Sequence, residues 1–390
     1  MTISALPLVP RRPTWLEIDR TALTSNVRLV RRRLAPQCQL MAVVKANAYG
    51  HGAPVTAITL LGAGVDRLAV ATLAEAIELR EAGVQAPILI LGYTPHWLAS
   101  ELVHYQVMPT IFDLATARAL AASAQAANRQ AALHVKVNTG MNRLGLRPEL
   151  VVGFLTELAA LPTLKVEGIF THFASADLAD KGFAQEQLTR FVTLLRQLER
   201  VGLRPDLAHA ANSAALLTMP ESYLDMVRCG IALYGLHPDA VETPLPPEFR
   251  PALTWKAEVA HVSKLEAGER IGYGEEFVAS QRMTVAVVPV GYADGFPRRP
   301  YHWNTVLIRG QPAPILGRVC MDQTIVDVSE ICATQGEVCQ GNEVVLLGRQ
   351  GDRALDVEEI AARLHTNNYD VVSRIMARVP RIYVNQPEDV

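Results

Sequence analysis

Residues 39–52 read QLMAVVKANAYGHG, and this stretch sets the pattern from which the fold can be predicted. The apolar run from Met41 to Val44 has the length and composition of a buried strand, and it ends on a cation, Lys45. A small polar loop with two glycines follows. The same order of an apolar run, a turn and an amphipathic helical stretch recurs along the first two thirds of the chain.

Eight such apolar runs lie between about residues 39 and 235: QLMAVVKA, RLAVA, PILILG, VMPTI, ALHVKV, KVEGIFTHF, DLAHAA and MVRCGIALYG. Helix-like segments separate them, and one of these segments has apolar residues at helical spacing before it closes on Gly202. Strands that alternate with helices indicate a parallel sheet, and eight of them predict a (β/α)8 TIM-type barrel. An open doubly wound sheet is the alternative, although no G-x-G-x-x-G follows a strand.

The repeat stops at a proline-rich segment, HPDAVETPLPPEFRPAL. Short β runs between glycine and proline turns follow it, among them MTVAVVPVGYA and NEVVLLG. We therefore predict two domains. Residues 14–243 form the cofactor-binding barrel, and residues 244–390, with residues 1–13, form a mainly-β domain.

Composition narrows the class of protein. With 390 residues, 49% of them hydrophobic, the chain can bury a large core. A net charge of −2 offers no basic surface for nucleic acid, and no apolar run approaches the roughly 20 residues of a membrane span. No signal peptide is apparent, and the five cysteines are spread without a CxxC pair. We expect a cytoplasmic protein with no nucleic-acid partner, membrane partner or metal site.

Polar residues follow the ends of several predicted strands, where a barrel enzyme carries its chemistry. They are Lys45, Arg143, His172, Asn212, Ser213 and Arg228. Each of them alone is consistent with an ordinary structural residue. The fold does not require so many polar residues at one rim of the barrel, and their convergence there indicates an active site.

Lys45 and Ser213 together suggest a class of cofactor. A buried lysine tends to lose its proton, and the neutral amine forms Schiff bases with aldehydes. Ser213 at a predicted helix start, and Gly230 in RCGIALYG, offer the donors of a phosphate site. A lysine beside a phosphate site suggests pyridoxal phosphate, and a phosphosugar enzyme is the alternative.

The stretch VVKANAYGHG resembles the cofactor-lysine motif of the alanine racemase family, a group of fold-type III pyridoxal phosphate enzymes. Other stretches resemble that family in its order: KVNTGMNRLG, GIFTHFASAD, HAANSAA, VRCGIALYGL, IGYG, VPVGYADGFPR, GRVCMDQTIVDV and RVPRIY. The resemblance covers about residues 14–383. It implies a barrel with a C-terminal β domain and pyridoxal 5'-phosphate as the cofactor.

The resemblance also implies a role for each matching residue. Lys45 matches the lysine that holds the cofactor as an aldimine, and Tyr273 matches the tyrosine that reaches the partner subunit's active site as the second base. Arg228 matches the arginine bonded to the pyridine nitrogen, with His209 behind it. The other matches are the phosphate ligands Tyr49, Ser213, Gly230, Ile231 and Tyr369; Asn212 beside them; His172 at the cofactor ring; Arg143 at the cofactor and substrate; Lys136, a carbamate in some members; Met321 at the substrate carboxylate; and Tyr292 and Asp322 at the entrance.

Two bases suit racemisation, because the Cα proton leaves from one face and a proton returns to the other. Lysine and tyrosine have ordinary pKa values of about 10.4 and 10, so both values must fall for this work. The resemblance implies that L-alanine and D-alanine are interconverted to supply D-alanine for peptidoglycan, in a homodimer with shared active sites. A racemase of serine or of a broader amino acid set is the alternative. A fold-type III amino acid decarboxylase is less favoured, because IGYG and CMDQ match racemases.

Overall fold

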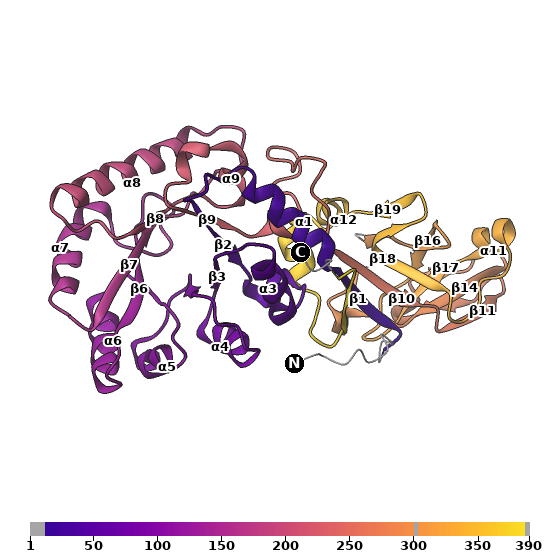
Figure 1. Cartoon of the computed structure of the whole chain (residues 1–390). Coiled ribbons are helices and arrows are strands. Elements are labelled where there is room, and N and C mark those ends of the chain that lie inside the picture. The colour runs from indigo at the N-terminus through magenta and orange to yellow at the C-terminus, as the bar shows by residue number, and fades with distance from the viewer. Residues whose placement is uncertain (1–11, 300–302, 387–390) are drawn as a thin grey trace. The chain divides into compact units, whose positions relative to one another are not determined.

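The structure is a computed structural model that describes residues 12–299 and 303–386. The described residues form two compact units, one of residues 22–250 and the other of residues 12–21 with residues 251–386 (Figure 1). Within these described residues, no helix combines the length and the apolar character that crossing a membrane requires.

The first unit is built on eight parallel strands, each hydrogen-bonded to the next along the chain or bridged to it. They are β2 (Gln39–Val43), β3 (Arg67–Val70), β4 (Ile88–Ile90), β5 (Thr110–Ile111), β6 (Ala131–Lys136), β7 (Leu164–Phe170), β8 (Leu207–His209) and β9 (Met226–Cys229). The ladders run β4-β3-β2-β9 and β5-β6-β7-β8. The first and last strands of the series, β2 and β9, are thus neighbours.

Backbone hydrogen bonds join these two ladders and close the ring. The N–H of Ile90 donates to the carbonyl of Met108 at 2.9 Å, just before β5. Between β8 and β9, the N–H of Asp225 donates to Ala208 at 3.1 Å, and the N–H of Arg228 donates to Ala211 at 3.0 Å. All eight strands match the eight apolar runs of the sequence, and the predicted (β/α)8 barrel is confirmed.

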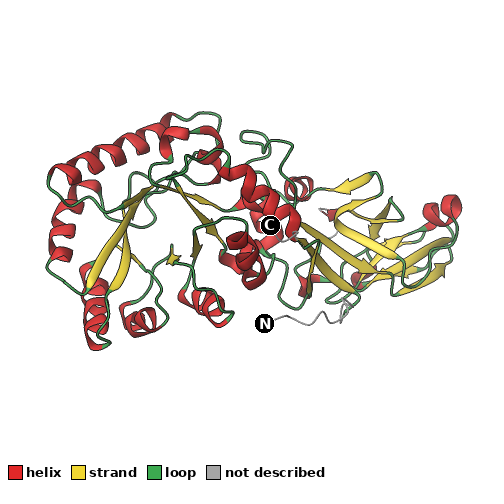
Figure 2. Cartoon of the chain, in the orientation of Figure 1, coloured by secondary structure: helices red, strands yellow, loops and turns green. Residues whose placement is uncertain are grey.

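Helices connect the strands and lie outside them (red in Figure 2). They are α1 (Arg20–Arg31), α2 (Lys45–Tyr49), α3 (Ala53–Gly62), α4 (Leu73–Glu81), η1 (His96–Leu98), α5 (Ala99–His104), α6 (Leu114–Ala126), α7 (Pro148–Ala159), α8 (Gly182–Arg200), α9 (Ser213–Thr218), η2 (Pro220–Ser222) and η3 (Ile231–Tyr234). Helix α8 buries one face, including Leu188, Phe191 and Leu198, as its apolar spacing predicts.

The second unit is a mostly antiparallel sheet, with the order β11-β14-β17-β16-β15-β18-β10-β1-β20. Its strands are β1 (Thr14–Asp19), β10 (Leu253–Glu258), β11 (His261–Leu265), β14 (Met283–Val288), β15 (Thr305–Ile308), β16 (Gln311–Leu316), β17 (Thr324–Asp327), β18 (Glu343–Gln350) and β20 (Arg381–Val384), with β19 (Arg353–Leu355) on β18. Smaller elements are β12 (Arg270–Ile271), β13 (Phe277–Val278), η4 (Tyr273–Glu275), η5 (Tyr292–Asp294), α11 (Ser329–Gln335), α12 (Val357–Arg363) and α13 (Asn368–Ser373). The predicted C-terminal mainly-β architecture is confirmed.

Strand β1 belongs to this sheet, although we assigned residues 14–21 to the barrel. It pairs antiparallel with β10 and parallel with β20. The two units part between residues 250 and 251, seven residues after the boundary we expected. The core of the second unit holds three aromatic side chains in mutual contact, those of Trp255, Phe296 and Trp303.

Candidate active site at the barrel rim

Lys45 lies directly after β2, at the start of a short turn with an unusual backbone. From Ala46 to Tyr49 all four residues have φ between 52° and 54°, so the turn is left-handed. L-residues avoid this conformation, at a cost of roughly 1–2 kcal/mol each. A backbone hydrogen bond of 2.8 Å from Ala48 to Val44 helps to hold the turn. The turn fixes the backbone from which the Lys45 side chain projects.

Glu75 of α4 supports this turn and acts on Lys45. One oxygen of its carboxylate accepts the N–H of Ala46 at 2.7 Å, and the other accepts the N–H of Ala71 at 2.7 Å. Burial and then the charge of Arg143 lower the pKa of Lys45, against the opposing effect of Glu75. The neutral amine is the form that attacks a carbonyl carbon and accepts a proton. The environment of Lys45 favours that form.

Hydrogen-bond donors gather beside the ring of Tyr49. The hydroxyl of Ser213, the first residue of α9, accepts the N–H of Gly230 at 2.9 Å. A Cβ atom on Gly230 would lie 2.6 Å from the Tyr49 hydroxyl, so the backbone of Gly230 packs directly on that phenol. Burial raises the pKa of Tyr49, and the phenol therefore keeps its proton at neutral pH. Such donors suit an anionic oxygen.

Two other residues that we predicted at this corner lie next to it along the chain. Asn212 caps α9, because its side-chain oxygen accepts the N–H of Ala215 at 2.9 Å. Ile231 begins η3 directly after Gly230, and it is buried. Their contacts with a cofactor stay a prediction.

Arg228 lies at the end of β9, buried, and its contacts fix its direction. Its Nη1 donates to Nδ1 of His209 at 2.9 Å, and its Nη2 donates to the carbonyls of Thr171 and Ala210, each at 2.9 Å. Nη2 also lies 3.2 Å from Nδ1 of His172. Among the described residues, these four contacts use the two terminal nitrogens of the guanidinium. Burial lowers the pKa of Arg228 to about 9, and the side chain stays a cation at neutral pH.

Lys136 and Arg228 both lie close to the ring of Phe170. Its Nζ lies 4.3 Å from the centre of the Phe170 ring, and the guanidinium carbon of Arg228 lies 5.2 Å from that centre. Both groups lie over the Phe170 ring, whose face attracts cations. Burial, and then the charges of Arg228 and Arg143, lower the pKa of Lys136 well below its ordinary value.

The charges of several predicted rim residues act on His172. Burial comes first among the causes that lower the pKa of His172. The charges of Arg228, Lys136, Arg143 and Lys45 follow it in that order. His172 is therefore neutral at neutral pH. These positive charges suit an anionic ligand.

The remaining predicted residues lie in the second unit. Tyr273 follows Gly272, whose φ is 70°, and its side chain is 69% exposed in the single chain. Met321 and Tyr292 are also exposed, which is uncommon for residues of their size and type. Tyr369 is the second residue of α13. The roles that we assigned to these residues at the cofactor and the entrance stay predictions.

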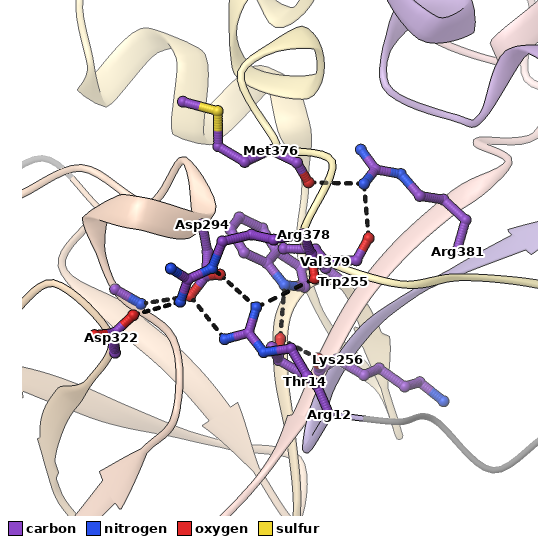
Figure 3. A network of polar contacts seen from close by, with 11 residues as sticks. Arg12, Thr14, Trp255, Lys256, Asp294, Asp322, Met376, Arg378, Val379 and Arg381 are labelled. Atoms are coloured by element: carbon purple, nitrogen blue, oxygen red, sulfur yellow. Dashed lines mark hydrogen bonds and ion pairs between the residues drawn. The ribbon is translucent and has the colours of Figure 1, made fainter.

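The turn that carries Tyr292 is anchored by a fully buried carboxylate, that of Asp294 (Figure 3). Its Oδ1 accepts from Nη1 of Arg12 at 2.7 Å and pairs with Nε of Arg378 at 2.7 Å. Arg378 also binds the carboxylate of Asp322 through Nη2. One buried carboxylate thus ties the turn at Tyr292 to the loop that carries Asp322.

Backbone contacts join the same turn to Met321. The N–H of Tyr292 donates to the carbonyl of Cys320 at 3.1 Å, and the N–H of Ala293 donates to the carbonyl of Met321 at 3.0 Å. A Cβ atom on Gly291 would lie 2.3 Å from the Met321 oxygen, so only glycine allows this approach. Two segments that we predicted to line the entrance are therefore held against each other.

Sequence reasoning missed several residues of these networks. Asp294 and Arg378 stand inside the quoted motifs GYADG and RVPRIY, yet their pairing brings distant segments together. Glu75 had a local signal, because Thr72 and Glu75 have the spacing of a capping box, which the structure contains. Within the described part of the chain, no three His, Cys, Asp or Glu side chains gather as a metal ion would require.

Comparison with known proteins identifies the family. Residues 18–238 match the family of alanine racemase N-terminal domains. Residues 252–383 match the family of alanine racemase C-terminal domains. An alanine racemase of Desulforamulus reducens is 44% identical over 96% of this chain and 100% of its own. The chain belongs to the alanine racemase family.

Solved structures support membership of the alanine racemase family. Alanine racemase from Bacillus anthracis with bound L-Ala-P has a TM-score of 0.90 and 37% identity, covering 96% of this chain and 95% of its own. A histidine racemase from Leuconostoc mesenteroides is similar as well, with a TM-score of 0.88 and 29% identity, covering 97% of this chain and 99% of its own. The fold therefore also occurs in a racemase of another amino acid.

Proposed function

We propose that this chain is an alanine racemase that interconverts L-alanine and D-alanine with pyridoxal 5'-phosphate as its cofactor. Membership of the alanine racemase family supports the reaction. The observation that carries the proposal is Lys45, a lysine of lowered pKa on a strained turn at the barrel rim. Supply of D-alanine for peptidoglycan is the corresponding role.

The residues present fit pyridoxal phosphate. The hydroxyls of Ser213 and Tyr49, which lie beside Gly230, suit its phosphate, and Lys45 supplies an amine for its aldehyde. The Nε–H of Arg228 can donate to the ring nitrogen, because the contacts that Arg228 makes with described residues come from Nη1 and Nη2. When bound, the cofactor withdraws electrons from the substrate Cα and so makes its proton acidic.

Lys45 and Tyr273 are the two proton-transferring residues of the proposal. The Lys45 amine removes or returns the Cα proton on one face, and the Tyr273 phenol serves the other face. Tyr273 lies exposed in the single chain, which suits a residue that enters another chain's site. The protein accordingly works as a homodimer with shared active sites.

Arg228 and the neighbouring cations tune the site. A guanidinium has donors and no acceptor, so Arg228 can donate to a ring nitrogen but cannot protonate it. This limits how strongly the ring withdraws electrons, and it thereby limits side reactions at Cα. Arg143 and Met321 receive the substrate carboxylate, and Tyr292 and Asp322 line the entrance. The charge of Arg143 is one of the causes that lower the pKa of Lys136, the residue that we place beside it.

One experiment tests the reaction and its substrate. The purified protein with pyridoxal phosphate is incubated in deuterated water with L-alanine, L-serine, L-lysine or L-histidine. D-isomer formation and deuterium at Cα are measured for each, with Lys45→Ala as the control. We expect D-alanine with deuterium at Cα, and no product from the variant. Turnover of another amino acid that rivals alanine would replace the proposal with the broader racemase, and release of carbon dioxide would replace it with a decarboxylase.

A further inference from the structure

A chain of buried polar side chains runs from Arg228 into the barrel interior. His209, whose Nδ1 accepts from Arg228, lies with its Nε2 2.8 Å from Nδ1 of His134 on β6. Both imidazoles are fully buried. The ring of Phe170 stacks on His209, with 4.7 Å between ring centres and 5° between planes. The proposed proton transfers do not use His134.

Beyond His134 the chain reaches a carboxylate. Glu167 is the extra residue of a β-bulge in β7, because Leu133 pairs with Val166 and His134 pairs with Gly168. Bulges redirect side chains, and here Oε2 of Glu167 lies 3.8 Å from Nε2 of His134. That separation exceeds a hydrogen bond, but it still allows the carboxylate to attract a proton carried on Nε2. Nε2 is buried and has no hydrogen-bond partner among the described residues, and the Glu167 carboxylate is the anion paired with it at this distance.

Two further residues hold this arrangement. Arg67, at the start of β3 across the barrel, donates to Oε1 of Glu167 at 3.0 Å and to the side chain of Gln39 at 2.6 Å. A Cβ atom on Gly168 would lie 2.4 Å from the His134 ring, so glycine makes room for that imidazole. The neighbouring His134 and Arg67 lower the pKa of Glu167 to about 2, and it is ionised at neutral pH.

The hydrogen bonds of this chain have only one consistent direction. A guanidinium donates and cannot accept, so Nδ1 of His209 must accept and its proton must sit on Nε2. That proton is donated to Nδ1 of His134, whose own proton must then sit on Nε2 and face Glu167. We infer that Glu167 and His134 are positioning residues for Arg228, because they fix the tautomer that lets His209 accept from the guanidinium.

The carboxylate matters because the opposite tautomer would place two donors face to face. If His134 carried its proton on Nδ1, it would donate to Nε2 of His209. The proton of His209 would then sit on Nδ1, against Nη1 of Arg228. Burial is the main cause that lowers the pKa values of both histidines. The doubly protonated, cationic imidazole is therefore disfavoured, and it does not resolve the conflict between the two donors. The anion of Glu167 favours the productive direction from the far end of the chain.

The inference rests on the proposed function only for the contact of Arg228 with the ring nitrogen. Its test therefore uses protein without cofactor, labelled with ¹⁵N-histidine, in which NMR reports the tautomer of each imidazole. The signals are assigned with His134→Gln and His209→Gln. In the unmodified chain we expect both residues as the neutral Nε2–H form from pH 6 to pH 8. An Nδ1–H form at either residue would overturn the inference.

A matched pair of double variants distinguishes the effect of an acceptor oxygen at position 167 from the effect of side-chain packing there. Arg67→Met with Glu167→Gln removes the charges but keeps an acceptor oxygen, while Arg67→Met with Glu167→Met removes the acceptor as well. Neither leaves an unpaired buried charge. We expect the methionine variant to show mixed tautomers. The glutamine variant, whose amide oxygen keeps a partial negative charge near Nε2, should keep more of the Nε2–H forms. Arg118→Met with Glu157→Met, which removes an exposed ion pair, is the control.

The same proteins, loaded with pyridoxal phosphate, give a second readout. We expect the methionine variant to lose about tenfold or more in turnover of L-alanine relative to the glutamine variant. Unchanged tautomers in both double variants, or mixed tautomers in the control, would overturn the inference. Correct tautomers without any racemisation would instead count against the proposed function alone.

Discussion

The backbone of Gly230 lies directly against the phenol of Tyr49, so closely that a Cβ atom would stand 2.6 Å from the hydroxyl and 3.1 Å from Cζ. Tyr49 is buried and cannot simply swing aside. The absence of a side chain at Gly230 is therefore a condition for keeping the hydroxyls of Tyr49 and Ser213 at one corner. This contact leads to the first prediction.

Gly230→Ala should weaken cofactor binding and lower the free energy of unfolding by about 1–3 kcal/mol, because the methyl group displaces Tyr49. Titration with pyridoxal phosphate and chemical denaturation measure the two effects. Gly153→Ala is the matched control, since Gly153 lies exposed in α7 with open space around it and should gain about 0.5–1 kcal/mol. Equal effects of the two substitutions would contradict the packing argument.

Mixed dimers should reveal whether Lys45 and Tyr273 come from different chains. Lys45→Ala and Tyr273→Ala are each expected to be inactive alone. Unfolded and refolded together, they should recover about a quarter of the activity, since half of the dimers would be hybrids with one intact site of two. No recovery despite hybrid formation, detected by differently tagged subunits, would place both residues of a site on one chain.

Acid should remove the stabilisation that the Glu167 carboxylate provides. Its pKa is held at about 2 in the folded chain against an ordinary value of 4.5, with His134 and Arg67 as the stabilising partners. The contribution, on the order of 1–3 kcal/mol, is therefore present above pH 4.5 and is lost as the pH falls toward 2. The difference in unfolding free energy between the unmodified chain and Arg67→Met with Glu167→Gln should shrink from pH 6 to pH 3. A difference that does not change with pH would refute this.

Asp294→Asn should destabilise the second unit by about 1–3 kcal/mol, because the carboxylate is buried while its two arginine partners are partly exposed. The substitution leaves Arg12 and Arg378 without the carboxylate that both contact, and breaking a buried ion pair from one side is costly. Asp352→Asn, in an exposed turn, is the control and should change the free energy of unfolding by less than about 0.5 kcal/mol. Thermal and denaturant unfolding of both variants check the prediction, which a neutral Asp294→Asn would contradict.

The barrel could be predicted from sequence because its signals are local. Each strand is an apolar run between turns, and the buried face of α8 follows from the spacing of residues such as Leu188 and Phe191. Polar residues at strand ends then pointed to one rim, because parallel strands place those ends together. In the structure, the charges of Arg228, Arg143 and Lys45 are among the causes that lower the pKa of His172.

Other features have no local signal. Alanine has no preference for left-handed backbone, so nothing at Ala46 or Ala48 indicates the turn after β2. The inward direction of Glu167 depends on a bulge that strand periodicity does not reveal. The pairing of Asp294 with Arg378 joins segments that are far apart in sequence. Each of these three features depends on tertiary contacts, and local sequence patterns do not reveal such contacts.

The left-handed turn from Ala46 to Tyr49 also creates a conflict between stability and activity for protein engineering. Glycine at Ala46 or Ala48 would relieve backbone strain in the folded state, and a screen for heat resistance would tend to select it. The same relief would loosen the backbone that directs Lys45. In this region heat resistance and turnover are expected to be opposing objectives, and an engineer would do better to seek stability in the β sheet.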